Sequence, residues 1–471
     1  MQRIIANAVL MFVLSATAVN AGPQSQTKSG SKGSASVPTE QTLRIRLELN
    51  PRDASAHKQL IEILRKKNAF RALVIEEATW IKNGPGDHLA LTELVSYAKV
   101  ALHDPEFAIE QQRSFLARAS RDADDFQYDV TRARLADDLN KRGRPQEALS
   151  ILDELVLLNP KDAGLWADRS APLLSLGRIT EATQSLRHSV EIDSSSESSH
   201  QALGDALAKG GDLSGAETEY RAAVSVYQAK YKKGETASSF DSLVKGLVDI
   251  EAAHHAEHSL AQTHLKLARV LMLQKKWEAA VAETQAALDA DETAGGAFYL
   301  RAQIYEAAGD HRPAEEARQA ARAAIEKLAQ GSPRSATHIS VDPRLLFLTE
   351  GIFDPESGAM AFSSEVLSIL EPRIAALSPM ERIMLAYAYL DLGRVSDAVQ
   401  QWEMGVSRDL KLDNPVAHAE FGERLWKAGA VADALPHLRR GYELDPQNMT
   451  YRMNYELVRK AAAETRSTRA D

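Results

Sequence analysis

Residues Arg132–Pro160, RARLADDLNKRGRPQEALSILDELVLLNP, decide how this chain folds. The stretch contains two runs in which apolar residues recur every three or four positions, the spacing of a buried helical face. The apolar positions are Leu135, Ala136 and Leu139 in the first run and Ala148, Leu152 and Leu155 in the second. Gly143 separates the runs, and Pro145 begins the second, where its missing N–H costs little. The stretch therefore predicts a helical hairpin that ends at Pro160.

The same pattern recurs along most of the chain, with adjacent units offset by about 34 to 36 residues, the period of a helix–turn–helix repeat. Each unit places a small residue in one or both of its helices, so that the two helices can approach closely. The small residues are Ala136, Gly204, Ala268, Ala302, Ala386 and Gly422 in the first helices, and Ala148, Ala182, Ala216, Ala280, Ala314, Ala398 and Ala434 in the second helices. This register predicts an all-α chain built from helix pairs.

The pattern resembles that of the tetratricopeptide repeat family. The resemblance implies an α-α superhelical solenoid of helix pairs, with the first helices lining a concave face. Ser170 departs from the small-residue pattern, and Pro172 lies inside a first helix, where we expect it to kink or shorten that helix. Residues 54–122 contain further helix pairs without a clear register.

Two interruptions of the period divide the predicted array into two sub-arrays. About one repeat length of extra chain follows the unit around Gly204. Turn signals such as Asp342-Pro343 and Asp354-Pro355 indicate a linker further on. The predicted segments are a signal peptide at 1–21, a flexible linker at 22–40, an N-terminal repeat array at 41–328 with an inserted helical segment at 227–260, a linker at 329–360, C-terminal repeats at 361–460 and a tail at 461–471.

The N-terminus has the features of a secretory signal. Arg3 supplies a positive start, Ile4–Leu14 is a short apolar core, and cleavage is expected after Ala21, which follows small residues. The core is shorter than the roughly 20 residues of an ordinary membrane span, so we expect no stable span after cleavage; an uncleaved anchor is the alternative. The chain has no cysteine, which fits a bacterial periplasm or secretion. We therefore predict an exported protein, periplasmic or secreted.

Charge and motifs argue against several classes of function. The formal net charge is -9, and acidic and basic residues are interspersed without a basic stripe, so nucleic acid is a poor candidate partner. No nucleophile elbow, phosphate-binding glycine loop or dinucleotide fingerprint occurs in the sequence. Acidic pairs such as Asp137-Asp138 do not form an acid/base couple, because adjacent helical residues point in different directions. We expect these carboxylates on the solvated surface. We predict neither an enzyme nor a cofactor.

In the tetratricopeptide repeat family the concave face binds extended peptides or partner helices, and the resemblance implies the same here. In the predicted register the lining includes Arg134, Asp137, Lys141, Gln201, Asp205, Lys266, Arg269, Tyr299, Gln303 and Glu306, and near the C-terminus Tyr387, Glu420, Glu423 and Trp426. Arginine, tyrosine and tryptophan supply much of the binding energy of interfaces. We therefore predict a protein-interaction scaffold with a protein or peptide partner. The alternative for each of these residues is a solvated polar surface.

Residues 251–258, EAAHHAEH, offer a competing interpretation. His254 and His258 are four residues apart and would project from one helical face, as metal ligands do. With Glu257 they fit the H-x-x-E-H pattern of a class of zinc peptidases. The chain would then be a metal-binding protein or a zinc-dependent hydrolase, whereas a solvated helix face is the simpler interpretation and predicts no metal site. A third interpretation is a self-associating structural protein, in other words a homo-oligomer.

Overall fold

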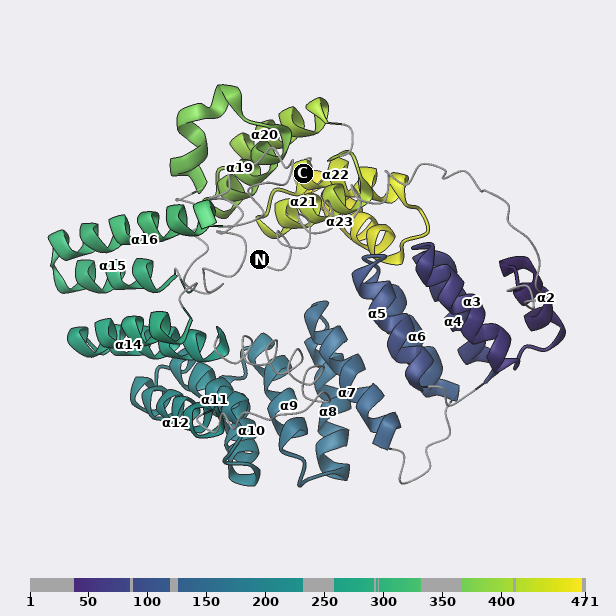
Figure 1. Ribbon diagram of the computed structural model, residues 1–471, viewed down its shortest axis with the longest axis horizontal. Coiled ribbons are helices and arrows are strands. Elements are labelled where there is room, and N and C mark those ends of the chain that lie inside the picture. Colours follow the sequence, from purple (N-terminus) through teal and green to yellow (C-terminus); the bar gives the residue numbers. More distant parts are fainter. Residues whose placement is uncertain are drawn as a thin grey trace, which may run out of the picture. The chain divides into compact units, whose positions relative to one another are not determined.

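The computed structural model describes residues 38–84, 88–118, 126–231, 258–291, 294, 296–331, 366–409 and 412–467. Within these ranges all regular secondary structure is helical, and successive helices form hairpins (Figure 1). The predicted all-α solenoid of helix pairs is therefore confirmed. The predicted signal peptide and nearly all of the following linker lie outside the described residues. None of the helices in the described ranges combines the length and apolarity needed to cross a membrane.

The helices have the following bounds. Those of the first half are α2 (Glu40–Leu49), α3 (Ala54–Lys66), α4 (Phe70–Asn83), α5 (His88–Val100), α6 (Pro105–Arg118), α7 (Phe126–Lys141), α8 (Pro145–Leu158), α9 (Ala163–Ser175), α10 (Ile179–Ile192), α11 (Glu197–Lys209) and α12 (Leu213–Tyr231). A helix over residues 258–273 follows, then α14 (Trp277–Ala290), α15 (Gly296–Ala308) and α16 (His311–Gly331). A short helix over residues 366–370 precedes the 3₁₀-helix η2 (Glu371–Ala376), α19 (Pro379–Asp391), α20 (Val395–Arg408), α21 (Pro415–Lys427), α22 (Val431–Leu444) and α23 (Met449–Ser467).

Glycines shape the hairpins in the places that the register predicts. Six glycines in hairpin turns have φ between +73° and +89°, a region that other residues rarely adopt: Gly143, Gly177, Gly211, Gly309, Gly393 and Gly429. Inside the helices, a Cβ added to Gly204 of α11 would lie 2.7 Å from the ring of Tyr220 on α12. The small residues of the register are therefore required by the close approach of the paired helices.

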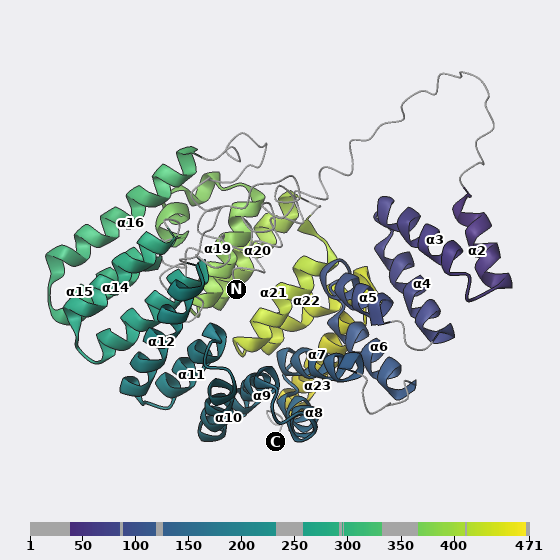
Figure 2. The same ribbon diagram turned by 60° about the horizontal axis from the view of Figure 1, so that its bottom comes forward.

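The described chain forms two compact units. In the described ranges, the central unit contains residues 152–412, and the terminal unit combines residues 38–151 with those from Asp413 onward. In the central unit the hairpins α9–α10 and α11–α12 pack side by side (Figure 2). In the terminal unit α23 packs on α22 and also contacts α6, which lies far from it in the sequence. The predicted linker at 329–360 lies almost entirely outside the described residues, so the boundary between the two sub-arrays stays a prediction.

Each unit has its own core, built from the apolar repeat positions. The core of the terminal unit includes Leu43, Leu60, Leu73, Leu94 and Phe115, and that of the central unit includes Leu186, Leu203, Tyr220, Leu271 and Ile304. Burying one such side chain contributes about 1.5–3 kcal/mol relative to leaving it exposed. Packing between neighbouring hairpins therefore holds each unit together.

Three local predictions have different outcomes. Pro172 does not shorten its helix: α9 has 13 residues, as α11 does, because the proline lies near the helix end and removes one backbone hydrogen bond. The predicted inserted segment 227–260 begins within α12, which has 19 residues and extends to Tyr231, while residues 232–257 lie outside the described residues. The predicted C-terminal repeats 361–460 begin, in their described part, with the short helix 366–370 followed by η2.

Candidate functional site

The predicted binding residues of α7 form an exposed polar surface. Arg134, Asp137 and Lys141 are three and four residues apart, so they lie on one side of the helix, and all three are exposed. Lys141 pairs with Asp137 at 2.6 Å. Arg134 Nη1 donates to Oγ1 of Thr92 on α5 at 2.9 Å, which shows that the first helices of neighbouring hairpins are adjacent. This surface, the α7 face (Arg134, Asp137 and Lys141), is open to solvent.

In the central unit the structure brings predicted residues of neighbouring hairpins together. Lys266 Nζ, on the helix 258–273, lies 2.7 Å from Asp205 Oδ2 on α11, and the Tyr220 hydroxyl donates to the other Asp205 oxygen at 2.6 Å. Gln201 on α11 donates to Thr263 Oγ1 at 3.1 Å. Because Asp205 neutralises Lys266, and the lysine side chain is only 22% exposed, its charge is less available to a partner than the sequence indicated.

The other predicted residues of the central unit differ in their access to solvent. Arg269, on the helix 258–273, and Tyr299, on α15, are half-buried, whereas Gln303 is exposed one turn after Tyr299. Glu306 on α15 forms an ion pair with Arg318 of α16. Of Arg269, Tyr299 and Gln303, only Gln303 is exposed enough to contact a partner without rearrangement. The binding role of all three residues stays a prediction.

The residues expected to line the C-terminal part of the surface are less open than the register indicated. Tyr387 on α19 is 8% exposed and packs edge-on against Trp402 of α20, with ring centroids 5.9 Å apart. Burial of Glu420 on α21 raises the pKa of its carboxyl to about 7. Glu423 accepts a hydrogen bond from Asn454 of α23 at 3.3 Å. Tyr387 is therefore a packing residue, and Glu423 takes part in a contact between helices.

Asp138, which we expected on the solvated surface, is buried. Its side chain is 4% exposed, pairs with Lys99 of α5 and accepts a hydrogen bond from Gln112 Nε2 of α6 at 2.8 Å. The expectation is wrong because Asp138 lies one position further round α7 than Asp137 and so faces the neighbouring hairpin. A buried carboxylate is tolerated when it is paired and hydrogen-bonded in this way.

The competing metal site draws no support from the residues that the structure describes. His258 Nδ1 lies 2.9 Å from Asp291 Oδ2. His254 and Glu257 lie outside the described residues. In the described ranges no three His, Cys, Asp or Glu side chains are grouped so that they could hold a metal ion. Elemental analysis tests this alternative: stoichiometric zinc that disappears in an H254A/H258A variant would favour it.

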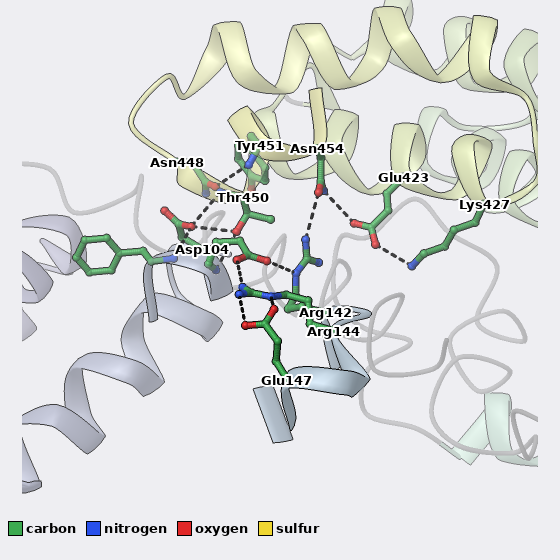
Figure 3. Close-up of polar contacts among 12 residues, drawn as sticks. Asp104, Arg142, Arg144, Glu147, Glu423, Lys427, Asn448, Thr450, Tyr451 and Asn454 are labelled. Atoms are coloured by element: carbon green, nitrogen blue, oxygen red, sulfur yellow. Dashed lines mark hydrogen bonds and ion pairs between the residues drawn. The ribbon is translucent and has the colours of Figure 1, made fainter. Parts of the chain in front are cut away.

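A junction between α23 and the turn before α6 is absent from the predicted features (Figure 3). The Asp104 carboxylate, 2% exposed, accepts the Met449 N–H at 2.9 Å, the Thr450 N–H at 3.1 Å and the Thr450 hydroxyl at 3.0 Å. It also accepts the Phe107 N–H at 3.2 Å, as an ordinary cap of its own helix. One buried carboxylate therefore caps two helix N-termini, although Thr450 is 346 residues from Asp104 in the sequence.

The connection between α22 and α23 adds two contacts to this junction. Asn448, completely buried, donates from Nδ2 to the Leu102 carbonyl at 2.9 Å and accepts the Tyr451 N–H at 3.1 Å. Asp445, at the end of α22, pairs with Arg71 at the start of α4 at 2.5 Å. The first three N–H groups of α23 therefore all have side-chain acceptors. A helix N-terminus needs such acceptors, because its first N–H groups have no partner within the helix.

A charged network flanks the junction at the α7–α8 turn (Figure 3). Arg142 donates from Nη2 to Asn454 Oδ1 on α23 at 3.2 Å and from Nε to Glu106 at 2.9 Å. Arg144 lies 3.7 Å from the other Glu106 oxygen and bonds Glu147 at 2.6 Å. The Arg144 hydrogen bond is the main reason why the pKa of Glu147 falls to about 2. Both arginines therefore remain paired with carboxylates beside α23.

A buried histidine recurs at one position of several first helices. The histidines are 7 to 8% exposed and are His57, His200, His264 and His418. His200 and His264 each bond a glutamate on the second helix, 19 residues later, at 2.7 Å. His418 meets His437 at 3.2 Å with the same separation. The histidine occupies the tryptophan position in the W-x₂-L-G pattern of the repeat. A polar pair therefore takes the place of an aromatic contact at this position. The recurring separation of 19 residues between the two polar partners is the sequence signal that could have revealed these pairs.

Comparisons with known proteins agree with these hairpins. Residues 383–449 match the family model of the tetratricopeptide repeat. A stretch of 70 residues is 37% identical to an inactive tetratricopeptide-repeat-containing thioredoxin of Arabidopsis thaliana, and it covers 15% of this chain and 10% of that protein. This chain thus spans about a tenth of that relative's length.

Solved structures give low overall similarity. The crystal structure of MamA is 16% identical over 41% of this chain and 96% of its own, with a TM-score of 0.32. YrrB, described as a tetratricopeptide repeat protein with an unusual peptide-binding site, is 17% identical over 40% of this chain and 93% of its own, with a TM-score of 0.30. The rest of the described chain repeats the same hairpin, with its turn glycines and close helix contacts. Residues 383–449 are therefore identified as tetratricopeptide repeat sequence, within an array of similar helix hairpins.

Proposed function

We propose that this chain is a non-enzymatic scaffold that holds a protein or peptide partner on the exposed faces of its first helices. The observation that carries the proposal is the array of helix hairpins, of which residues 383–449 match the tetratricopeptide repeat model. Proteins of this family bind protein or peptide partners. Stacked repeats present equivalent faces in a row, which gives an extended surface. Such a surface suits an extended peptide or a partner helix better than a small molecule.

The α7 face is the surface that we propose as the main contact. The side chains of Lys141 and Asp137 are 66% and 55% exposed. Exposed ion pairs contribute about 0.2–1 kcal/mol, so a partner can rearrange this pair at little cost. Lys266 and Asp205 are less exposed, at 22% and 36%, and the Tyr220 hydroxyl also bonds Asp205, so a partner would have to break more contacts there.

Charge reversal on α7 tests the proposal. The R134E/K141E variant is compared with R312E/R439E, which reverses two charges at exposed sites on the second helices α16 and α22. Partners are captured by crosslinking in the cell fraction that contains the native protein and are identified by mass spectrometry. We expect at least one specific partner to be lost from R134E/K141E and kept by R312E/R439E. Equal recovery of every partner by both variants, with unchanged thermal melting, would contradict an α7 contact.

We also propose that the scaffold acts outside the cytoplasm, in the cell envelope or in the secreted space. The signal-like segment 1–21 and the absence of cysteine support this location. N-terminal sequencing of the protein from its native host tests it. We expect a mature chain that begins at Gly22 in the exported fraction, and an intact Met1 in a cytoplasmic fraction would contradict the proposal.

A further inference from the structure

We propose that the segment from Asp445 to Asn454 is a releasable strap that sets the curvature of the N-terminal repeats. This segment, the C-terminal strap, comprises the residue after α22, the connection to α23 and the beginning of α23. The proposal concerns the shape of the terminal unit and is independent of which partner the scaffold binds.

The C-terminal strap meets the turns of three successive hairpins in order. Asp445 pairs at 2.5 Å with Arg71, the second residue of α4, beside the α3–α4 turn. Asn448 then donates to a backbone carbonyl of the α5–α6 turn at 2.9 Å. Asn454 finally accepts a hydrogen bond from Arg142 in the α7–α8 turn at 3.2 Å. Successive residues of the strap therefore contact successive repeats.

The junction has the properties of a built interface. Four of its polar side chains are almost completely buried, with Asp104 at 2%, Asn448 at 0%, and Thr450 and Asn454 at 5% exposed. Each of them forms hydrogen bonds across the junction. Polar groups buried without partners are costly and rare in folded proteins. The complementary bonding therefore indicates a specific contact between α23 and the hairpin turns.

When the strap leaves, each helix keeps one capping side chain from its own segment. Asp104 still accepts the Phe107 N–H of α6, and Asn448 still accepts the Tyr451 N–H of α23. The Met449 and Thr450 N–H groups lose Asp104 and can bond to water instead. The strap can therefore detach while each helix keeps a local cap, as expected of an element with two discrete arrangements.

A strap of this kind changes the mechanics of a repeat array. In a solenoid each repeat contacts only its neighbours, and curvature arises from the small rotation at each step. Such local contacts leave the curvature adjustable. Contacts from one segment to three consecutive turns prevent those turns from moving apart. We therefore expect one curvature of α3–α8 with the strap docked and a range of curvatures after its release.

The distance between two spin labels on α3 and α8 measures this curvature. The chain has no cysteine, so K58C and Q146C provide two specific labelling sites, both exposed and outside the strap. The release variant R71A/T450V/N454A removes strap contacts and retains both capping residues, Asp104 and Asn448. The matched control Q41A/R52A/T79V makes similar replacements at exposed sites on α2, α4 and the α2–α3 turn.

We expect a narrow distance distribution in the parent and the control, and a distribution at least twice as wide in the release variant, with equal helicity by circular dichroism. Hydrogen exchange at the Met449 and Thr450 amides reports independently whether the strap has detached. An unchanged narrow distribution together with faster exchange would show that the strap does not set the curvature. Amides that stay protected in the release variant would show that these contacts do not hold the strap. Either result overturns the proposal.

A charge swap keeps the proposal testable if the triple variant loses helicity. R71D places a second carboxylate beside Asp445 and should widen the distribution of distances between the two spin labels. R71D/D445R restores an ion pair between the same positions and should return the distribution to the parent width. If R71D leaves the width unchanged, or if the swap fails to narrow it, the proposed anchoring of the strap to α4 is wrong.

Discussion

Replacement of Asp104 by alanine is the most direct perturbation of the terminal unit. The carboxylate accepts hydrogen bonds from Met449, Thr450 and Phe107, and the Thr450 hydroxyl adds a fourth. Alanine removes all of these acceptors at once and leaves backbone N–H donors of two helices without their caps. We expect a loss of stability in the terminal unit that far exceeds the effect of an ordinary surface substitution.

The magnitude follows from two contributions. Loss of an N-terminal cap costs about 0.5–2 kcal/mol, and a buried donor left without an acceptor costs about 1–3 kcal/mol. Water that enters the vacated space recovers part of this cost. We therefore expect Asp104→Ala to lower the free energy of unfolding of the terminal unit by about 3–5 kcal/mol. Asp104→Asn keeps one acceptor oxygen and should cost about 1–3 kcal/mol.

Urea titration followed by hydrogen exchange of individual peptides measures the two units separately. Peptides from α6 and α23 report on the terminal unit, and peptides from α11 and α12 report on the central unit. The matched control is Asp137→Ala, which removes an exposed carboxylate of α7 and should change stability by less than about 0.5 kcal/mol. A loss below about 1 kcal/mol for Asp104→Ala, or equal losses for both variants, would refute the reasoning.

Three further predictions concern single side chains. Burial and the nearby His418 lower the pKa of His437 from 6.5 to about 4, so the unfolded chain protonates first and this residue alone lowers the stability of the terminal unit by up to about 3 kcal/mol as the pH falls from 6.5 to 4. Because Glu420 contributes an opposite slope over much of this range, the His437 contribution is read from the difference in urea midpoint between the parent and H437Q. Glu420 acts in the opposite direction, because burial raises its pKa from 4.5 to about 7, so stability falls by up to about 3 kcal/mol as the pH rises from 4.5 to 7, and E420Q should abolish that loss. Gly204→Ala should destabilise the central unit by about 1–3 kcal/mol in thermal or urea unfolding, because the new Cβ would lie 2.7 Å from the Tyr220 ring. Gly84→Ala serves as the control, because its new Cβ would lie 3.7 Å from the nearest atom, the Trp80 carbonyl oxygen.

The hairpins could be predicted from the sequence because each depends on residues that are close together along the chain. Gly204 and Tyr220, whose close approach requires a small residue, are 16 positions apart and belong to one repeat. Gly143 adopts φ +73° in the short turn between α7 and α8. Such local demands repeat with the period of the array and therefore become visible as a pattern.

The candidate binding surface was less predictable because exposure depends on what a neighbouring repeat contributes. The period places Asp137 and Asp138 on α7, but it does not show that Lys99 and Gln112 cover only the second of them. Lys266 has the same difficulty, since its partner Asp205 lies 61 residues earlier. Helical spacing identifies a face of a helix, whereas the charge that remains available on that face is decided by side chains from other repeats.

The C-terminal strap could not be predicted from the sequence. The physical reason also determines how tightly the strap is held. Asp104 and Asn448 each cap their own helix, so neither residue has an unmet local demand that would indicate a distant partner. The long-range bonds therefore replace bonds to water, and each is worth only about 0.5–1.5 kcal/mol. Their sum is a few kcal/mol before the entropy of holding α23 in place is subtracted. A contact of that size holds the strap in the free protein, yet a binding partner that prefers another curvature can supply enough differential affinity to release it.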